Sequence, residues 1–197
     1  MPLLTALFAT VLLMGLGLSI LLLGSGETAL AALDRDARSL SYASRAASAL
    51  AVADLRALPS WAALSMPGAV PEVSALPGRF VDTSLTPRVA WAAVPLDLRA
   101  LTLRLQAEAA AAAPAGATVP SWRLFDYGPM AALVPEGASR SPAYLAVWVA
   151  DDAGVIVVRA VAYGPGEGRS ITEVSVTRDA GPDPPGRLRI LAVRPGR

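Results

Sequence analysis

The residues best suited by type and spacing to bind an ion are Asp151, Asp152 and Gly154, which form an Asp-Asp-x-Gly sequence. Carboxylate oxygens are natural ligands for Ca²⁺, but that ion takes about six to eight oxygen ligands, and two carboxylates fall well short. The same residue types between two apolar runs are typical of a tight turn. We therefore expect a hairpin turn here and no calcium loop.

Three other groups have residue types that could carry chemistry. The segment 164–168, GPGEG, resembles a phosphate-binding loop, but no Lys-Ser/Thr pair follows it and it joins two expected strands, so we expect a turn. The carboxylates of Glu108, Asp126 and Glu136 are candidates for acid–base work, yet their spacing pairs none of them. Four tryptophans could anchor a partner surface, and we expect two or three of them to fill the core beneath a sheet instead: Trp61, Trp91, Trp122 and Trp148.

The composition excludes whole classes of site. The 197 residues include no Cys and no His, which excludes disulfides, a Ser-His-Asp or Cys-His triad, and nearly every zinc, copper, haem or iron–sulfur centre. All 17 basic residues are Arg, and 16 acidic residues leave a net charge of +1, which argues against a nucleic-acid surface. We expect no enzyme activity, no cofactor, no metal and no nucleic-acid partner.

An apolar segment at the start of the chain explains why 54% of the residues are hydrophobic and only 17% are charged. No charged residue precedes Glu27, and residues 3–23 read LLTALFATVLLMGLGLSILLL, about the 20 residues that cross a bilayer core. A secretory signal peptide has a basic start and a shorter apolar core, and a buried core helix rarely runs this long without a polar face. A transmembrane helix fits best. Because no basic residue flanks the segment, we interpret Met1-Pro2 as a mature end left after removal of a basic leader.

A proline-free stretch predicts that this helix continues far beyond the membrane. No proline lies between Pro2 and Pro59, and residues 27–58 are rich in Ala, Leu and Arg. We predict one helix, or two nearly collinear ones, over 3–58, a length of roughly 80 Å. Apolar residues recur at spacings of three and four along its outer half: Leu30, Leu33, Ala37, Leu40, Ala43, Ala47, Leu50 and Leu58. Within this stripe, Leu33, Leu40, Leu50 and Leu58 are expected to pack on a globular domain or on a neighbouring helix.

Four glycines, Gly15, Gly17, Gly24 and Gly26, lie inside the predicted helix. Glycine in a helix interior costs about 1 kcal/mol relative to alanine. The four are either ordinary glycines of a membrane helix or a stretch that bends or melts when the helix leaves the membrane. We divide the chain into a membrane and assembly part, 1–26, and a globular domain, 27–197, which includes the outer half of the helix.

The rest of the chain predicts an α+β domain. Residues 59–97 contain six prolines and are expected to be extended connections with one short strand at 88–94, followed by a second helix at 98–113. Apolar runs separated by short Gly- or Pro-containing turns predict a four-stranded antiparallel meander: 143–150, 155–164, 170–178 and 187–193. A further short strand is expected at 122–126. One face of the sheet is expected to pack on the outer half of the long helix.

This organisation resembles the type IV pilin fold, and the residues resemble the PilX-like minor pilins. The stretch PLLTALFATVLLMGLGLSILLLGSGETALAAL (2–33) is similar to that family's apolar start and its exit from the membrane. The stretch LSYASRAASALAVADLRAL (40–58) resembles the family's next block, and residues 144–152, 158–178 and 188–194 resemble its C-terminal segments. The resemblance implies a minor subunit of a type IV pilus. Such a subunit is made in the bacterial inner membrane, with its globular domain outside the cytoplasm, and then joins the cell-surface pilus.

The resemblance also implies partners and a position. The partners are other minor pilins and the major pilin, through the N-terminal helix, and a tip adhesin, in a pilus that serves adhesion and motility. Major pilins carry Glu at mature position five; if Met1 is the mature start, this chain has Thr5 there, which favours a place at or near the tip. If numbering begins elsewhere, Thr5 has no such meaning. The residues expected to serve assembly in the membrane helix are Thr5, Ala9, Gly15, Gly17, Gly24 and Gly26. Two alternatives stay open: a type II secretion pseudopilin, and a single-pass membrane-anchored binding module of unknown ligand.

Overall fold

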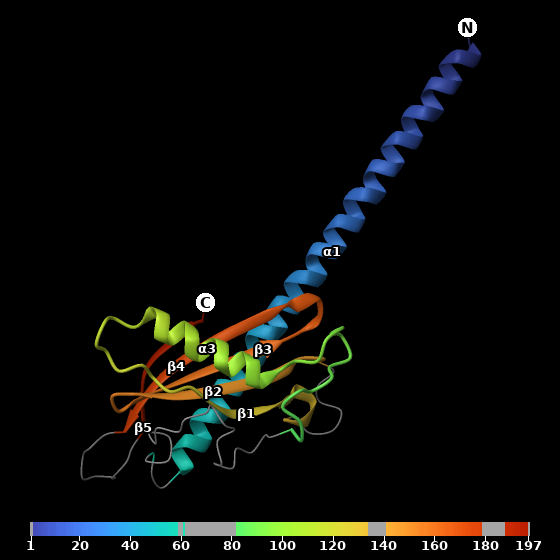
Figure 1. Cartoon of the computed structure of the whole chain (residues 1–197). Coiled ribbons are helices and arrows are strands. Elements are labelled where there is room, and N and C mark those ends of the chain that lie inside the picture. The colour runs from blue at the N-terminus through green and yellow to red at the C-terminus, as the bar shows by residue number, and fades with distance from the viewer. Residues whose placement is uncertain (1, 59–60, 62–81, 134–140, 179–187, 197) are drawn as a thin grey trace. The chain divides into compact units, whose positions relative to one another are not determined.

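A computed structural model describes residues 2–58, 61, 82–133, 141–178 and 188–196, and it divides the chain into two compact units, Met1–Arg38 and Ser39–Arg197. The division expected after residue 26 lies inside the first unit. The helices are α1 (Pro2–Ala57) and α3 (Leu98–Ala112), as labelled in Figure 1. The strands and short 3-10 turns are β1 (Arg123–Pro129), η1 (Met130–Ala132), β2 (Tyr144–Asp152), β3 (Val155–Tyr163), η2 (Pro165–Glu167), β4 (Arg169–Arg178) and β5 (Leu188–Pro195).

The long helix predicted over 3–58 is confirmed as the single helix α1, which passes through all four glycines without a break. Its last turn closes with the Leu58 N–H donating to the Asp54 carbonyl at 3.2 Å. The guanidinium of Arg178, on β4, donates to the carbonyl of Leu58 and lies 4.8 Å from the centre of the Trp61 ring. A cation at this end satisfies a terminal carbonyl and is favoured by the helix dipole. Arg178 therefore joins the end of α1 to the sheet.

The sheet has five antiparallel strands in the order β1-β2-β3-β4-β5, so the predicted meander is confirmed but the expected count of four is too low. The fifth strand is β1, at the short strand expected near 122–126. The helix predicted at 98–113 is confirmed as α3, and the Oδ1 of its N-cap Asp97 accepts the Ala100 N–H at 2.9 Å. The strand expected at 88–94 is wrong. Prolines at 87 and 95 cannot donate to a ladder, and the segment forms turns closed by Ala92 N–H to Val89 O and Leu96 N–H to Pro87 O.

Both turns preferred over ion-binding loops are confirmed. Strands β2 and β3 are joined by Ala153 and Gly154, whose φ values of 52° and 87° are those of a two-residue hairpin turn. Asp151 Oδ1 accepts the Gly154 N–H at 2.8 Å, so this carboxylate serves the turn. Residues 164–168 close a second turn, with Gly164 N–H donating to Gly168 O at 2.8 Å. Gly166 there has φ 64°, which glycine adopts without steric cost.

Within the second unit the sheet is covered on both faces, by α1 on one side and by α3 on the other (Figure 1). The expectation that one face of the sheet packs on the outer half of the long helix is confirmed. The second face is covered by α3 and by the apolar side chains of Leu85, Val89, Trp91 and Leu96. Strand β2 is buried at seven consecutive positions, which is typical of a central strand between two layers. Its side chains alternate between the faces, with Leu145, Val147 and Val149 toward α1 and Ala146, Trp148 and Ala150 toward α3.

Small side chains bring α1 close to the sheet. The buried face of the helix contains Ala43, Ser44, Ala47, Ser48, Ala51, Val52 and Leu55. The Ser44 hydroxyl lies 2.9 Å from the Thr172 hydroxyl on β4, so a buried polar pair is satisfied between the two layers. Leu40 sits over Gly164, where an added Cβ would lie 2.8 Å from Leu40 Cδ2. A larger residue at 164 would therefore displace Leu40.

The segment before α3 is attached to the sheet by polar contacts. The hydroxyl of Tyr144 donates to Asp82 Oδ2 at 3.1 Å, and the Asp82 N–H donates to the Tyr127 carbonyl at 2.9 Å. The indole N–H of Trp91 donates to the Pro142 carbonyl at 2.8 Å. Burial, and then the nearby charge of Asp82, raise the pKa of the Tyr144 phenol, so it stays a hydrogen-bond donor at all ordinary pH.

Two of the four tryptophans fill the core, as expected. Trp148 is 2% exposed and Trp122 is 7% exposed, both on the α3 side of the sheet, whereas Trp61 and Trp91 are half-buried. The indole N–H of Trp148 donates to Thr102 Oγ1 at 2.8 Å, and that hydroxyl donates to the Leu98 carbonyl at 2.7 Å. This chain of two hydrogen bonds connects β2 to the first turns of α3.

Replacing Thr102 by valine should destabilise the domain by about 1–3 kcal/mol, because the buried indole N–H of Trp148 loses its acceptor. Thr102→Ser keeps the hydroxyl and is the matched control. Urea unfolding of Thr102→Val, Thr102→Ser, Trp148→Phe and the double variant Thr102→Val/Trp148→Phe measures the free energy of each. A double-mutant cycle then gives the coupling energy between Thr102 and Trp148. If Thr102→Val costs no more than Thr102→Ser, the hydrogen bond contributes nothing to stability.

Candidate membrane-spanning and assembly segment

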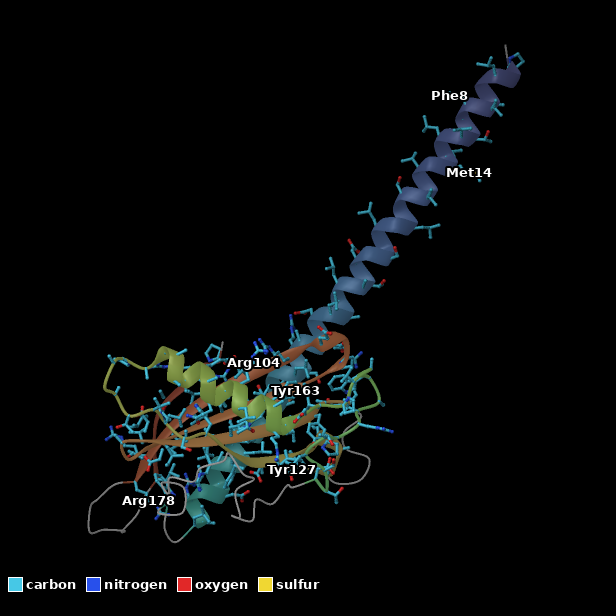
Figure 2. The ribbon with its side chains drawn as sticks, viewed as in Figure 1. Phe8, Met14, Arg104, Tyr127, Tyr163 and Arg178 are labelled. Atoms are coloured by element: carbon cyan, nitrogen blue, oxygen red, sulfur yellow. The ribbon has the colours of Figure 1, made fainter. Side chains whose placement is uncertain are left out.

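The first unit presents an unbroken apolar surface. Every large apolar side chain described between residues 4 and 23 is more than half exposed, from 52% at Leu12 to 81% at Met14. Figure 2 shows these side chains, Phe8 and Met14 among them, projecting outward from the helix. Soluble monomers rarely expose so large an apolar patch to water. Among the described residues, α1 is the one helix long and apolar enough to cross a membrane.

The hydroxyls of this segment are satisfied within the helix itself. Thr10 Oγ1 donates to the carbonyls of Ala6 and Leu7 at 3.0 and 2.8 Å, and Ser19 Oγ donates to the Gly15 carbonyl at 2.9 Å. In a bilayer core no water is present to bond a polar group, so internal partners are required. Thr10 and Ser19 therefore do not interrupt a lipid-facing surface. Thr5 lies in the same helix, and its side chain is outside the described part of the chain.

The glycines leave the helix surface open. A Cβ added at Gly15, Gly17, Gly24 or Gly26 would meet nothing within 4 Å, so no contact inside the chain requires glycine there. Gly15 and Gly17 form an apolar notch with Met14, Leu18 and Leu21. Ala9, one of the expected assembly residues, is also exposed. In membranes, small residues of this kind allow close approach of a second helix. That the glycines let the helix bend or melt stays a prediction.

The leucines expected to pack against the domain lie in different surroundings. Leu40 is 7% exposed and belongs to the core between α1 and the sheet, and the half-buried Leu58 packs against that core. Leu50 is half-buried and lines a groove with Asp54 and Asp126. Leu33 is 66% exposed and is not among the described core residues, so its expected packing on the domain or on a neighbouring helix stays a prediction. The buried face of α1 begins at Leu40, and a neighbouring helix remains the expected partner of Leu33.

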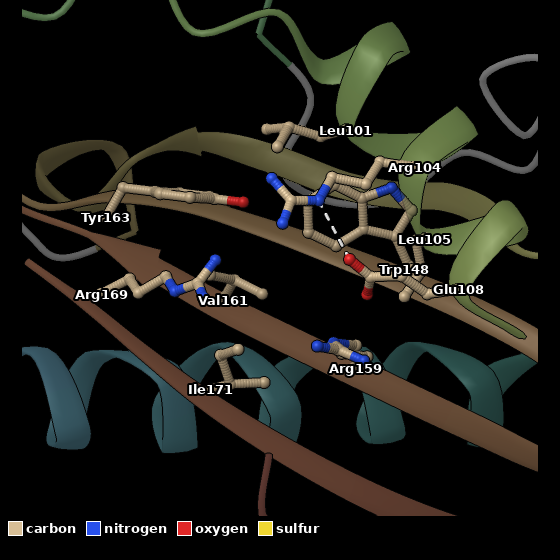
Figure 3. A pocket seen from close by; sticks show the side chains of 10 residues that line it. All are labelled: Leu101, Arg104, Leu105, Glu108, Trp148, Arg159, Val161, Tyr163, Arg169 and Ile171. Atoms are coloured by element: carbon tan, nitrogen blue, oxygen red, sulfur yellow. Dashed lines mark hydrogen bonds and ion pairs between the residues drawn. The ribbon is translucent and has the colours of Figure 1, made fainter. Parts of the chain in front are cut away.

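A shallow pocket on the α3 side gathers charged side chains but no acid–base set (Figure 3). Three arginines, Arg104, Arg159 and Arg169, lie around the phenol of Tyr163, which points into the pocket. Arg104 pairs with Glu108 at 3.0 Å, and Arg159 pairs with Glu173 at 3.2 Å. Burial raises the pKa of Tyr163 to about 12, although the arginines act in the opposite direction. The phenol is therefore protonated at neutral pH.

The carboxylates considered for acid–base work do not come together. Glu108 lies on α3, in the ion pair with Arg104, whereas Asp126 is 3% exposed on β1 and lines the groove on the α1 side. Glu136 lies outside the described residues. Asp54 of α1 lines the same groove as Asp126, a proximity that no sequence spacing predicts because the two come from distant elements. No group of three residues able to hold a metal ion occurs among the described residues.

The feature with a clear functional meaning is thus the apolar half of α1. It is exposed on all sides, internally hydrogen-bonded and notched by glycine. No family model matches the chain, nor does any curated protein or any solved structure. The features that bear on function are one helix able to cross a membrane and the sheet domain whose core that helix enters.

Proposed function

We propose that this chain is a PilX-like minor subunit of a type IV pilus. Before assembly the subunit resides in the bacterial inner membrane, and it then enters the pilus at or near its tip. The observation that carries the proposal is the continuity of α1. One unbroken helix begins as an exposed apolar segment, at 4–23, and continues as the central core element of the domain, at 40–55.

This continuity favours a subunit over a tethered module. A membrane-anchored enzyme or binding domain needs only a linker between its anchor and its fold, and its core does not include the anchor helix. In this chain, Leu40 and Leu55 of the same helix are core residues, 7% and 0% exposed. On extraction from the membrane, neighbouring helices would take the place of lipid around the apolar half. The resemblance of residues 2–33 and of the C-terminal strands to PilX-like pilins supports the same function.

The place at or near the tip is supported by the lack of charge in the apolar segment. Residues 2–26 include no acidic side chain, so this segment offers no carboxylate to the amine of a neighbouring subunit. Contacts in the membrane would instead be made by shape, at the notch of Gly15 and Gly17. The partners proposed are other minor pilins, the major pilin and a tip adhesin. A type II secretion pseudopilin would use the same architecture and is distinguished by the experiment below.

Loss of the chain should sharply reduce surface pili and pilus-dependent motility, and the wild-type chain should restore both. In sheared pili, quantitative mass spectrometry should find far fewer copies of this chain than of the major subunit, because a tip subunit is present once per fibre end. A matched pair of variants tests the notch: Gly15→Leu/Gly17→Leu should impair restoration. Ala29→Leu/Ala31→Leu places two leucines at the same spacing on exposed positions outside the notch and outside the expected assembly residues, and it should restore pili normally.

Three results would contradict parts of this proposal. Normal pili in the absence of the chain would exclude an assembly role. Stoichiometry like that of the major subunit would exclude the tip. Intact pili combined with lost protein secretion would identify a pseudopilin instead.

A further inference from the structure

Among the described residues, a second surface of the domain is left uncovered, on the α1 side of β5. Helix α1 meets β4 through Ser44 and Thr172, and a groove of about 410 Å³ lies between α1 and β5. Ile190 and Val193 of β5 pair in register with Val176 and Val174 of β4. The β4 residues are 0% and 4% exposed, whereas Ile190 and Val193 are 51% and 63% exposed. Core-facing positions of the last strand are therefore open.

The dimensions of the two layers explain the opening. Five strands spaced about 4.8 Å apart make a sheet roughly 19 Å wide, whereas one helix with its side chains is only about 10–12 Å across. Ala49 and Ala53, one turn apart on α1, are exposed and form its side of the groove. Small side chains at this spacing let the backbone of a neighbouring helix come close. A second helix packed at the usual interaxial distance of about 8–10 Å from α1 would lie over β5, and the small side chains of α1 would allow that approach.

Addition of a strand to the edge of β5 is opposed by the strand itself. A register shift places Leu191 in a bulge, because Val176 pairs with Ile190 while Ser175 pairs with Ala192. Pro195 has no N–H to offer, and Arg189 and Arg194 are exposed along the strand. Bulges, prolines and charged side chains are the devices that protect a sheet edge from further pairing. The open apolar positions are accordingly those on the face of the strand, not those along its edge.

Two cations stand at the ends of the groove. Arg45 and Arg56 both line it, both are exposed, and neither forms an ion pair within the described part of the chain. Eleven positions separate them, which is about three helical turns, or roughly 16 Å. Arg56 lies in the last turn of α1, where the helix dipole favours a cation. Arg45 lies in the helix interior, where the dipole gives no such stabilisation. An occupant that matches this pattern is apolar in its middle and acidic toward both ends.

We infer that this groove docks an acidic amphipathic helix of another polypeptide, which lies beside α1 on the open face of β5. Its apolar stripe covers Ala49, Ala53, Ile190 and Val193, and carboxylates about three turns apart meet Arg45 and Arg56. The site lies in the second unit, apart from the membrane segment. It stands whether or not the chain is a pilus subunit.

The test uses the full chain in phosphatidylcholine nanodiscs and two synthetic peptides, with empty nanodiscs as the blank. One peptide is an Ala-rich helix with a Leu stripe and two Glu eleven positions apart, and the other has Lys in place of both Glu. Fluorescence anisotropy should show binding of the Glu peptide alone, with helical circular dichroism gained on binding. The variant Arg45→Glu/Arg56→Glu should lower the affinity for the Glu peptide by at least about tenfold, and it should permit the Lys peptide to bind.

Matched variants keep the test specific. Arg88→Glu/Arg99→Glu makes the same change in net charge at two exposed arginines outside α1, β4 and β5, and it should leave binding unchanged. Ala53→Trp fills the groove with an exposed substitution and should abolish binding even if the charge-reversed variant fails to fold. An equal loss of binding in the Arg88/Arg99 control would mean general electrostatic attraction and would overturn the inference. No binding of the Glu peptide, binding without gain of helix, or a chain dimer abolished by Arg45→Glu/Arg56→Glu would overturn it as well, the last in favour of a second copy.

Discussion

Two carboxylates placed in the apolar half of α1 should release the chain from membranes. Leu13 and Leu16 are 67% and 53% exposed in the middle of the segment, so Leu13→Asp/Leu16→Asp puts two charges where lipid would surround the helix. Each Asp at the centre of a membrane helix costs about 2.5–3.5 kcal/mol, or about 5–7 kcal/mol for two. Most of the protein should therefore move from the carbonate-washed membrane fraction to the supernatant.

The matched control makes the same substitution, two exposed leucines to aspartate, outside the apolar segment. Leu30→Asp/Leu33→Asp changes two leucines that are 68% and 66% exposed, but between Glu27 and Asp34, where the sequence is already charged. This variant should stay in the membrane fraction, and deletion of 1–26 should give a soluble 27–197 fragment. If the Leu13/Leu16 variant still sediments with membranes, or if the unaltered chain is soluble without detergent or partners, the membrane assignment is wrong.

Helices and strands were predictable from the sequence where a single strong local preference sets their bounds. The freedom from proline between Pro2 and Pro59 predicts α1, and short Gly-containing turns predict the meander. The strand at 88–94 failed because its apolar residues pack from a turn, with Val89 and Trp91 lying against the α3 side of the sheet. The two-sided burial of β2 could not be foreseen, because only the tertiary fold places α3 over the second face.

The buried face of α1 shows why the packing residues were only partly predicted. A search for leucine at helical spacing picks Leu33 and Leu50, but the core uses Ser44 and Ser48, which are 0% and 4% exposed. Their polarity suggests a solvent face, yet each hydroxyl donates to a carbonyl of its own helix, to Ser41 at 3.1 Å and to Arg45 at 2.8 Å. The hydroxyls can be buried because these bonds satisfy them, and the small side chains allow close approach. Hydropathy alone does not report either property.

Leu55, which the leucine spacing did not single out, should be the most sensitive position of the helix. It is fully buried in the core between α1 and the sheet, and its carbonyl accepts the Trp61 indole N–H at 3.1 Å. Leu55→Ala leaves a cavity close to the Arg178 contact at the end of the helix, and a buried Leu→Ala change costs about 2–5 kcal/mol. Urea unfolding followed by tryptophan fluorescence should show the midpoint shifted with an unchanged slope.

A series along α1 separates packing on the sheet from packing on other subunits. Leu40→Ala should cost nearly as much as Leu55→Ala, because Leu40 fills the space over Gly164, and the half-buried Leu50 should cost less. Leu33→Ala is the control: an exposed substitution stays within about 0.5 kcal/mol of the wild type. The order Leu55, Leu40, Leu50, Leu33 follows burial within one chain. Equal costs at Leu33 and Leu55 would mean that α1 is stabilised by neighbouring subunits instead of by its own sheet, and the continuity on which the proposed function depends would lose its energetic basis.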